Sequence, residues 1–210
     1  MNDFALKSGE KIVLIGDSIT DCGRLEDFPP FGNGYVSIVV NLSDAKYPER
    51  IIEWVNKGIS GDTVGGLASR WTVDVVEEKP DWVSVAIGIN DVARDYESRK
   101  ELSKALGDFE GHYRQILNRT KSISARLILS EAFFVAEEDG ARRGFRVEPY
   151  NAIICKLAEE YGARFVPLSQ VLRQVKMKRP DHVWTTGDGV HPNLAGHTLI
   201  ALHVLEALGW

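Results

Sequence analysis

The chain has 210 residues, a length typical of a single domain with a sizeable buried core, and we expect one domain over residues 1–210. Its 25 basic and 30 acidic residues leave a net charge of −5, which argues against nucleic-acid binding because a phosphate backbone requires a basic stripe. Two cysteines, Cys22 and Cys155, are too few for a disulfide framework, and we expect both to be free thiols.

Short β-branched apolar runs alternate with longer amphipathic stretches along the whole chain. This alternation predicts right-handed crossovers and a parallel sheet covered on both faces, that is, a three-layer α/β/α sandwich with five parallel strands. The expected strands are residues 11–16, 51–56, 82–88, 126–130 and 164–166. The expected helices are residues 35–47, 63–78, 101–120, 147–161, 169–178 and 193–208.

No targeting or membrane segment is evident in the sequence. Residues 1–10 lack the cationic start and apolar core of a signal peptide. The longest apolar run in the middle of the chain, around residues 82–89, is far shorter than the roughly 20 residues that cross a bilayer. We therefore expect a cytoplasmic protein that does not interact with membranes.

Polar residues follow the strands at the end where parallel sheets collect their ligands. Gly16-Asp17-Ser18 ends the first strand, residues 57–63 follow the second, and Gly88-Ile89-Asn90-Asp91 follows the third. A fourth segment, residues 188–191, precedes the last helix. These four segments are predicted to meet at one edge of the sheet.

Ser18 is the candidate nucleophile at this edge, and its hydroxyl needs a base within hydrogen-bond reach. His191 lies in a loop, and Asp188, three residues earlier, can turn back to accept a proton from its Nδ1. An Asp-x-x-His loop is weak evidence alone, but together with Ser18 it predicts the split catalytic triad of an ester hydrolase. We expect His197 and His203 to have packing or surface roles, and His112 to be solvated.

The tetrahedral intermediate of such a reaction requires hydrogen-bond donors for its oxyanion. The candidates are the backbone N–H groups of Ser18 and Gly61 and the side-chain amide of Asn90. Gly61 could equally be a plain turn residue, and Asn90 a helix cap or Asx-turn. We expect their acidic neighbours Asp17, Asp62 and Asp91 to support these residues through hydrogen bonds, and Asp17 to be the most important of the three.

These segments resemble the signature blocks of the SGNH hydrolases, also called the GDSL esterase family. The resemblance implies the flavodoxin-like SGNH hydrolase fold, with Ser18 as nucleophile, Asp188 and His191 completing the triad, and Gly61 and Asn90 as oxyanion donors. It implies no cofactor and no metal. The matching blocks are Gly16-Asp17-Ser18, the Gly61 turn, Gly88-Ile89-Asn90-Asp91 and Asp188-Gly189-Val190-His191-Pro192.

The resemblance covers nearly the whole chain and is nearest to the cytoplasmic acetylxylan esterases. It implies a serine esterase that removes acetyl groups from carbohydrates, with acetylated xylo-oligosaccharides as the expected substrates, and we also expect a homo-oligomer. The position directly before the triad acid departs from the relatives. They have an aromatic residue at this position, whereas this chain has Gly187, with Trp184 three residues earlier. The rim of the pocket is therefore expected to differ.

Aromatic and basic residues near the site have two interpretations each. Phe28, Phe31 and Trp184 could offer ring faces to a sugar, or could pack against the core or a subunit. Arg142, Arg143 and Arg146 could bind an acidic substituent, or could belong to a solvated surface or an oligomer contact. Helix positions such as Leu199, Ile200, Leu202 and Leu205 could serve a core or an interface.

Three other functions compete with carbohydrate deacetylation. A lipid or thioester hydrolase could use the same triad, but it would need a deep apolar groove. A sugar-binding or assembly protein could carry a relic triad. A metal enzyme could use Asp17, Asp21, Cys22 and His191 as ligands, although no spacing matches His-Glu-x-x-His or paired Cys-x-x-Cys.

Overall fold

The computed structural model describes residues 4–138 and 146–210. It contains the predicted five-stranded parallel sheet, in the order β2-β1-β3-β4-β5. The register pairs Ile12 with Trp82 and Val85 with Leu129, so that β3 lies at the centre. The strands are β1 (Lys11–Gly16), β2 (Glu53–Asn56), β3 (Trp82–Ala86), β4 (Arg126–Ser130) and β5 (Arg164–Val166).

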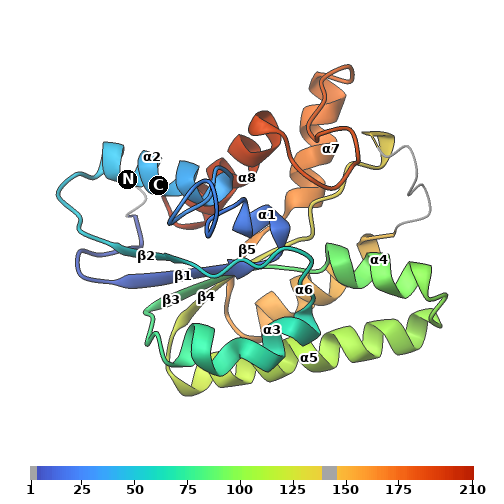
Figure 1. Cartoon of the computed structure of the whole chain (residues 1–210), viewed down its shortest axis with the longest axis horizontal. Helices are drawn as coiled ribbons and strands as arrows, with labels where there is room; N and C mark the ends of the chain where they lie inside the picture. The colour runs from blue at the N-terminus through green and yellow to red at the C-terminus, as the bar shows by residue number, and fades with distance from the viewer. Residues whose placement is uncertain (1–3, 139–145) are drawn as a thin grey trace.

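Helices cover both faces of this sheet, which confirms the predicted three-layer α/β/α architecture (Figure 1). One layer contains α1 (Ser18–Asp21), α2 (Tyr35–Lys46), α7 (Leu168–Lys178) and α8 (Leu194–Ala207). The other contains α3 (Val64–Trp71), the π-helix η1 (Thr72–Val76), α4 (Ile89–Glu97), α5 (Leu102–Ser122) and α6 (Glu148–Glu160). A short 3-10 helix, η2 (Ala136–Glu138), follows β4.

The core lies between the sheet and the two helical layers. Val13 and Leu14 of β1 and Val83 and Val85 of β3 are fully buried, as expected for central strands covered on both faces. Trp71 at the end of α3 is also fully buried. Burial of each of these valine and leucine side chains stabilises the fold by about 1.5–3 kcal/mol relative to exposure. The central strands are therefore a rigid support for the residues at their carboxyl ends.

One expected helix and two expected strands differ from the sequence-based expectation in type or length. The helix expected over 63–78 is α-helical only to Trp71 and continues as the π-helix η1, where Glu77 N donates to Thr72 O at 2.9 Å. Arg119 Nη1 donates a hydrogen bond to Ala68 O at 3.0 Å, near the point where the helix changes from α to π. The third strand ends at Ala86 instead of residue 88. The second begins at Glu53 instead of residue 51, and Ile51 is 79% exposed.

Helix α4 was not expected at all. Its sequence is rich in charge, and only Ile89 and Val92 are buried, so its apolar signal is weak. The helix nevertheless matters to the site, because it begins immediately after the third strand and carries Asn90 and Asp91.

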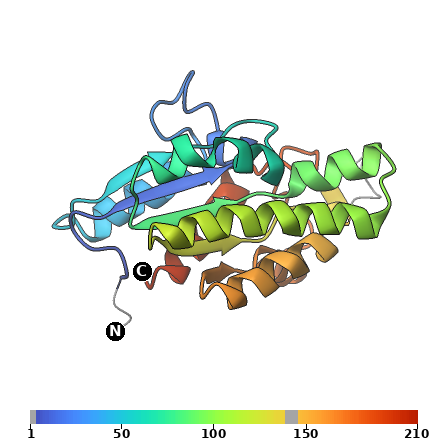
Figure 2. The ribbon, with the colours of Figure 1, turned by 90° about the horizontal axis from the view of Figure 1, so that it is seen from below.

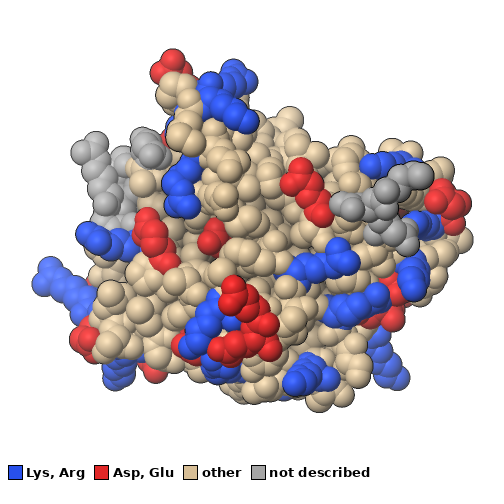
Figure 3. Space-filling model, turned by 180° about the vertical axis from the view of Figure 1, so that it is seen from behind, with Lys and Arg blue, Asp and Glu red and all other residues tan. Residues whose placement is uncertain are grey.

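The described chain begins and ends near the amino ends of the strands, away from their carboxyl ends (Figures 1 and 2). Ala5 N donates to Leu208 O at 2.8 Å, which ties the two ends together. Within residues 4–138 and 146–210, no helix is long and apolar enough to cross a membrane. Acidic and basic side chains intermingle on the face drawn in Figure 3, and no stripe of one sign crosses it.

Candidate active site

Ser18 is the first residue of α1, directly after the buried end of β1. Asp17 caps this helix, and its Oδ1 accepts a hydrogen bond from Ile19 N at 3.0 Å. Gly16 is required at the strand end, because a Cβ there would lie 2.2 Å from Ala86 O of the neighbouring strand. Close packing of β1 on β3 and the Asp17 cap together fix where the Ser18 hydroxyl stands.

The structure brings Ser18, His191 and Asp188 into one hydrogen-bonded chain. Ser18 Oγ lies 3.0 Å from His191 Nε2, and His191 Nδ1 lies 2.6 Å from Asp188 Oδ2. The second carboxylate oxygen, Asp188 Oδ1, accepts from Val190 N at 2.9 Å and from His191 N at 2.8 Å. An ionised Asp188 therefore favours the tautomer with the proton on Nδ1, which leaves Nε2 free to accept the proton of Ser18.

The pKa of Asp188 lies below its ordinary value. Partial burial alone would raise the pKa, but the hydrogen bonds from the His191 ring and from the N–H groups of His191 and Val190 outweigh it. Asp188 thus remains ionised at neutral pH, as an acid that orients a histidine must.

The loop that carries Asp188 and His191 is fastened at both ends. Thr186 N donates to His191 O at 2.9 Å, next to an isolated bridge between Thr185 and Pro192. Asn193 begins α8, where its Oδ1 accepts from Gly196 N at 3.0 Å. This cap at the start of the last helix sets the direction in which the loop leaves the site.

The two remaining oxyanion candidates lie in adjacent segments. Gly61 occupies an exposed turn after β2 with φ +78°, a backbone conformation that favours glycine, and a Cβ there would meet no atom within 4 Å. Asn90 is the second residue of α4, and its Nδ2 donates to Asp62 O at 2.9 Å. One N–H of the Asn90 amide is used in that bond, and a second remains for a substrate.

Asp21 and Arg70 link the Gly61 turn to the nucleophile segment, and sequence reasoning gave neither residue this role. Asp21 Oδ2 accepts from Ser60 Oγ at 2.7 Å and from Ser60 N at 3.2 Å. Arg70 donates to Asp62 Oδ2 at 2.8 Å and to the carbonyl oxygens of Lys57 at 2.9 Å and Gly16 at 3.3 Å. No local signal marks these contacts, because most of them join residues that are distant in sequence.

Burial raises the pKa of two carboxyl groups behind the site. Asp17, only 2% exposed, has its pKa raised to about 7, and Asp91 reaches about 7 as well. In both cases desolvation is the largest cause and a backbone hydrogen bond opposes it, from Ile19 to Asp17 and from Val64 to Asp91. All three expected acidic neighbours therefore do hydrogen-bond near the site, since Asp62 accepts from Thr63 N and Arg70.

The aromatic residues expected at the rim lie in different environments. Phe28 is 47% exposed, whereas Phe31 is partly buried and packs against the core. Trp184 also packs against the core, with its ring edge-on to His182 at 4.6 Å between centroids. A role for any of the three in sugar binding stays a prediction.

Arg146 is exposed and lines a hollow of about 180 Å³ with Tyr96, Lys100 and Tyr150. Arg142 and Arg143 lie outside the described residues. Whether these arginines bind an acidic substituent stays a prediction as well.

The other expectations about single residues are confirmed where the structure bears on them. Cys22 and Cys155 are free thiols. His112 is exposed, and His197 is 8% exposed, with Nδ1 accepting from Tyr35 N at 3.2 Å and a pKa lowered to about 4 by burial. Among the four uncertain helix positions, Leu202 is exposed and the other three, Leu199, Ile200 and Leu205, are core residues.

Among the described residues, the apolar hollow behind the nucleophile segment is small. The apolar hollow next to Asp17, Ile19 and Tyr35 has a volume of about 20 Å³, little more than one water molecule occupies. Within the described part of the chain, no cluster of three or more His, Cys, Asp or Glu side chains has the arrangement of a metal site.

Comparison with known proteins agrees with this geometry. The profile of the GDSL-like Lipase/Acylhydrolase family matches residues 14–199. The acetylxylan esterase of Geobacillus stearothermophilus is 41% identical over 212 residues, covering 97% of this chain and 95% of the relative. The crystal structure of Axe2, an acetylxylan esterase from that organism, superposes with a TM-score of 0.85 at 39% identity, covering 98% of this chain and 97% of that one. A thioesterase 1/protease 1/lysophospholipase L1 of Escherichia coli strain K12 is 31% identical over 198 residues, 94% of this chain and 83% of the relative.

The chain therefore belongs to the GDSL-like lipase/acylhydrolase family, which confirms the family resemblance inferred from the four sequence segments.

Proposed function

We propose that this protein is a serine carboxylic ester hydrolase that removes acetyl groups from acetylated carbohydrates, with xylo-oligosaccharides as the acceptor class. One observation carries the reaction type: Ser18 Oγ, the His191 ring and the Asp188 carboxylate form a continuous chain with distances of 3.0 and 2.6 Å. That chain is the arrangement that turns an unreactive serine hydroxyl into a nucleophile.

The reaction begins when Ser18 Oγ attacks the acetyl carbonyl carbon and His191 Nε2 takes the hydroxyl proton. Asp188 stabilises the imidazolium that forms. The oxyanion of the tetrahedral intermediate accepts hydrogen bonds from Ser18 N, Gly61 N and Asn90 Nδ2. The imidazolium then gives its proton to the sugar oxygen, the ester C–O bond breaks, and acetyl-serine remains. Water, activated by the same histidine, hydrolyses this intermediate and releases acetate.

The small acyl group is supported chiefly by similarity. The apolar hollow behind Asp17 has a volume of about 20 Å³, which is too small to bury a long acyl chain at that place. The acetylxylan esterase of Geobacillus stearothermophilus, at 41% identity, matches nearly the full length of both chains. An exposed Phe28 near the nucleophile segment offers a ring face to a sugar.

A lipid or thioester hydrolase that uses the same triad is the second candidate. It is favoured by the 31% identity to the Escherichia coli thioesterase 1/protease 1/lysophospholipase L1. Its lower identity, 31% against 41%, ranks it after carbohydrate deacetylation.

We further expect residues 1–210 to act as one domain, without cofactor or metal, in a cytoplasmic homo-oligomer. Size-exclusion chromatography with light scattering would measure the assembly directly, and a monomer at micromolar concentration would contradict the oligomer.

The first experiment measures acetate release from acetylated xylo-oligosaccharides beside p-nitrophenyl esters with acyl chains of two to twelve carbons. Ser18→Ala serves as the control, since it removes the attacking oxygen and leaves the packing of α1 unchanged. Acetate release that depends on Ser18 and activity that falls steeply with acyl length support the deacetylase. Hydrolysis of long chains without sugar deacetylation would favour the second candidate, and Ser18-independent turnover would overturn the triad.

A further inference from the structure

The segment between α7 and α8 carries the acid and base of the proposed triad but has almost no regular secondary structure. Its one bridge joins Thr185 to Pro192. Its two glycines, Gly187 and Gly189, flank Asp188 with φ +100° and +72°, conformations that favour glycine and restrain the chain only weakly. Asp188 accepts hydrogen bonds from Val190 N and His191 N of the same segment, and contacts from outside hold the segment itself in place.

Glu138, at the end of η2, provides the densest set of such contacts. Its Oε1 and Oε2 accept from Trp184 N at 2.9 and 3.0 Å. Oε2 also accepts from Thr185 N at 2.7 Å and from Thr185 Oγ1 at 2.8 Å. The carboxylate is only 8% exposed, so water does not replace these partners easily.

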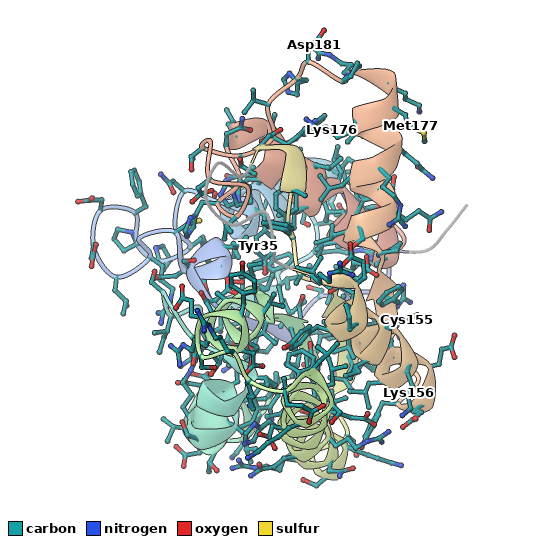
Figure 4. The ribbon with its side chains drawn as sticks, turned by 90° about the vertical axis from the view of Figure 1, so that its right-hand side faces the viewer. Tyr35, Cys155, Lys156, Lys176, Met177 and Asp181 are labelled. Atoms are coloured by element: carbon teal, nitrogen blue, oxygen red, sulfur yellow. The ribbon has the colours of Figure 1, made fainter. Side chains whose placement is uncertain are left out.

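Lys176 of α7 neutralises this buried charge. Its Nζ lies 3.1 Å from Glu138 Oε1 and donates to the carbonyl oxygens of His182 at 3.3 Å and Pro180 at 3.5 Å. Figure 4 shows Lys176 on the side of α7 that faces this segment, whereas Met177 is directed away. Burial by itself would raise the pKa of Glu138, but the hydrogen bonds from Trp184 N, Thr185 and Lys176 outweigh it and hold the pKa below its usual value.

Thr185 transmits the contact to the triad. Its hydroxyl donates its proton to Glu138 and accepts from both Gly187 N and Gly189 N at 3.2 Å, so donor and lone pairs are all used. Gly189 O in turn accepts from Val135 N at 2.8 Å. The residue between the two glycines is Asp188, which is thereby held from both sides by a network that starts at Glu138.

We propose that Glu138, with Lys176 as its counter-ion and Thr185 as its link, is a positioning residue that sets the distance between Asp188 and His191 during the reaction. This inference rests on the proposed ester hydrolase function. Glu138 touches no reacting atom, and its effect is exerted through the backbone of residues 184–189. Misplacement of a catalytic group by about 1 Å costs on the order of 10²-fold in rate, which sets the scale of the expected effect.

The test compares isosteric and conservative variants at the two ends of this network. Glu138→Gln replaces an acceptor-only carboxylate by an amide whose N–H groups face the N–H donors of residues 184 and 185. Thr185→Val keeps the shape but removes the hydroxyl, and Thr185→Ser restores it. The control is Glu160→Gln, which removes a carboxylate from the surface pair of Glu160 and Arg114 between α6 and α5.

We expect kcat on an acetyl ester to fall by about 10²-fold in Glu138→Gln and Thr185→Val, with KM changed less than threefold. Thr185→Ser and Glu160→Gln should stay within threefold of the wild type. A downfield proton resonance between His191 Nδ1 and Asp188 should be lost or shifted in the two impaired variants only, and this readout needs no turnover. Assays are run well below the melting temperature of each variant, so that unfolding does not contribute.

Three results would overturn the inference. They are an unchanged kcat in both Glu138→Gln and Thr185→Val, a loss of kcat in Thr185→Ser equal to that in Thr185→Val, or an unaltered downfield resonance in Glu138→Gln and Thr185→Val. If Glu138→Gln does not fold, the comparison of Thr185→Val with Thr185→Ser tests the inference without it. A wild type without Ser18-dependent turnover instead refutes the proposed function, and the proton resonance then still reports whether Glu138 positions Asp188.

Discussion

Asn90 donates from Nδ2 to the carbonyl oxygen of Asp62 at 2.9 Å, which joins the start of α4 to the turn that carries Gly61. The two oxyanion candidates that come from different strands are therefore fixed relative to each other before any substrate arrives. Preorganisation of this kind is what allows donors to stabilise developing charge without reorganisation during the reaction.

Asn90→Ala should lower kcat by about 10²- to 10³-fold, because it removes one oxyanion donor from a preorganised site. KM should change little, since the bond strengthens only in the transition state. Steady-state kinetics on a two-carbon ester measures both parameters. Asn41→Ala, on the exposed face of α2, is the matched control, and an unchanged kcat in Asn90→Ala would leave Asn90 as a structural link to Asp62 only.

Arg70→Lys should reduce kcat about tenfold or more, although Arg70 lies in α3 and outside the predicted triad. The guanidinium holds Asp62 Oδ2, Lys57 O and Gly16 O at once, and an ammonium group cannot reproduce this fork. The measurement is kcat beside the melting temperature, with Arg114→Lys on the surface as control. Activity equal to that of the wild type would show that the Gly61 turn holds its position without Arg70.

Asp17→Asn should flatten the pH dependence of stability. The pKa of Asp17 is raised from 3.8 to about 7, so the folded chain binds this proton more tightly than the unfolded chain does. The resulting stabilisation is fully present below about pH 4 and is lost as the pH rises through about 7. Asn keeps the Oδ1 acceptor for Ile19 N but cannot ionise.

The drop in melting temperature from pH 5 to pH 8 should therefore be smaller in Asp17→Asn than in the wild type, by a few °C, since 1 kcal/mol corresponds to about 2–4 °C at this length. Asp44→Asn, at an exposed position of α2, is the control. Identical pH slopes in Asp17→Asn and the wild type would contradict the raised pKa of Asp17.

Two glycine substitutions should have opposite effects on stability. Gly107→Ala lies on the exposed face of α5 with no atom within 4 Å of the new Cβ, and should stabilise the fold by about 0.5–1 kcal/mol. Gly16→Ala places its Cβ 2.2 Å from Ala86 O and 2.4 Å from Thr20 Oγ1, so β1 and β3 must separate. We expect a loss of about 1–3 kcal/mol or more together with loss of activity. Urea unfolding measures both changes, and a stable, active Gly16→Ala would refute the close approach of β1 to β3.

The sequence alone predicted the sheet, its five strands and the residues that approach one another at its edge. Alternation of buried strands with amphipathic helices leaves few arrangements other than a parallel sheet, and parallel strands present their carboxyl ends on one side. Ser18 at the end of β1 and Asn90 after β3 were placed by that rule alone. The rule works because it depends on local pattern and chain direction, and both are written in consecutive residues.

Other features were decided only by tertiary structure. The contact of Arg119 with Ala68 near the change from α3 to η1, the bond of Arg70 to Gly16 O and the bonds of Glu138 join residues that are far apart along the chain. Glu138 and Thr185, for example, are separated by the whole of α6, β5 and α7. Local propensity determines the type and direction of an element. The partner of a buried charge depends instead on which hydrogen-bond donors and counter-ions lie next to it in the folded chain.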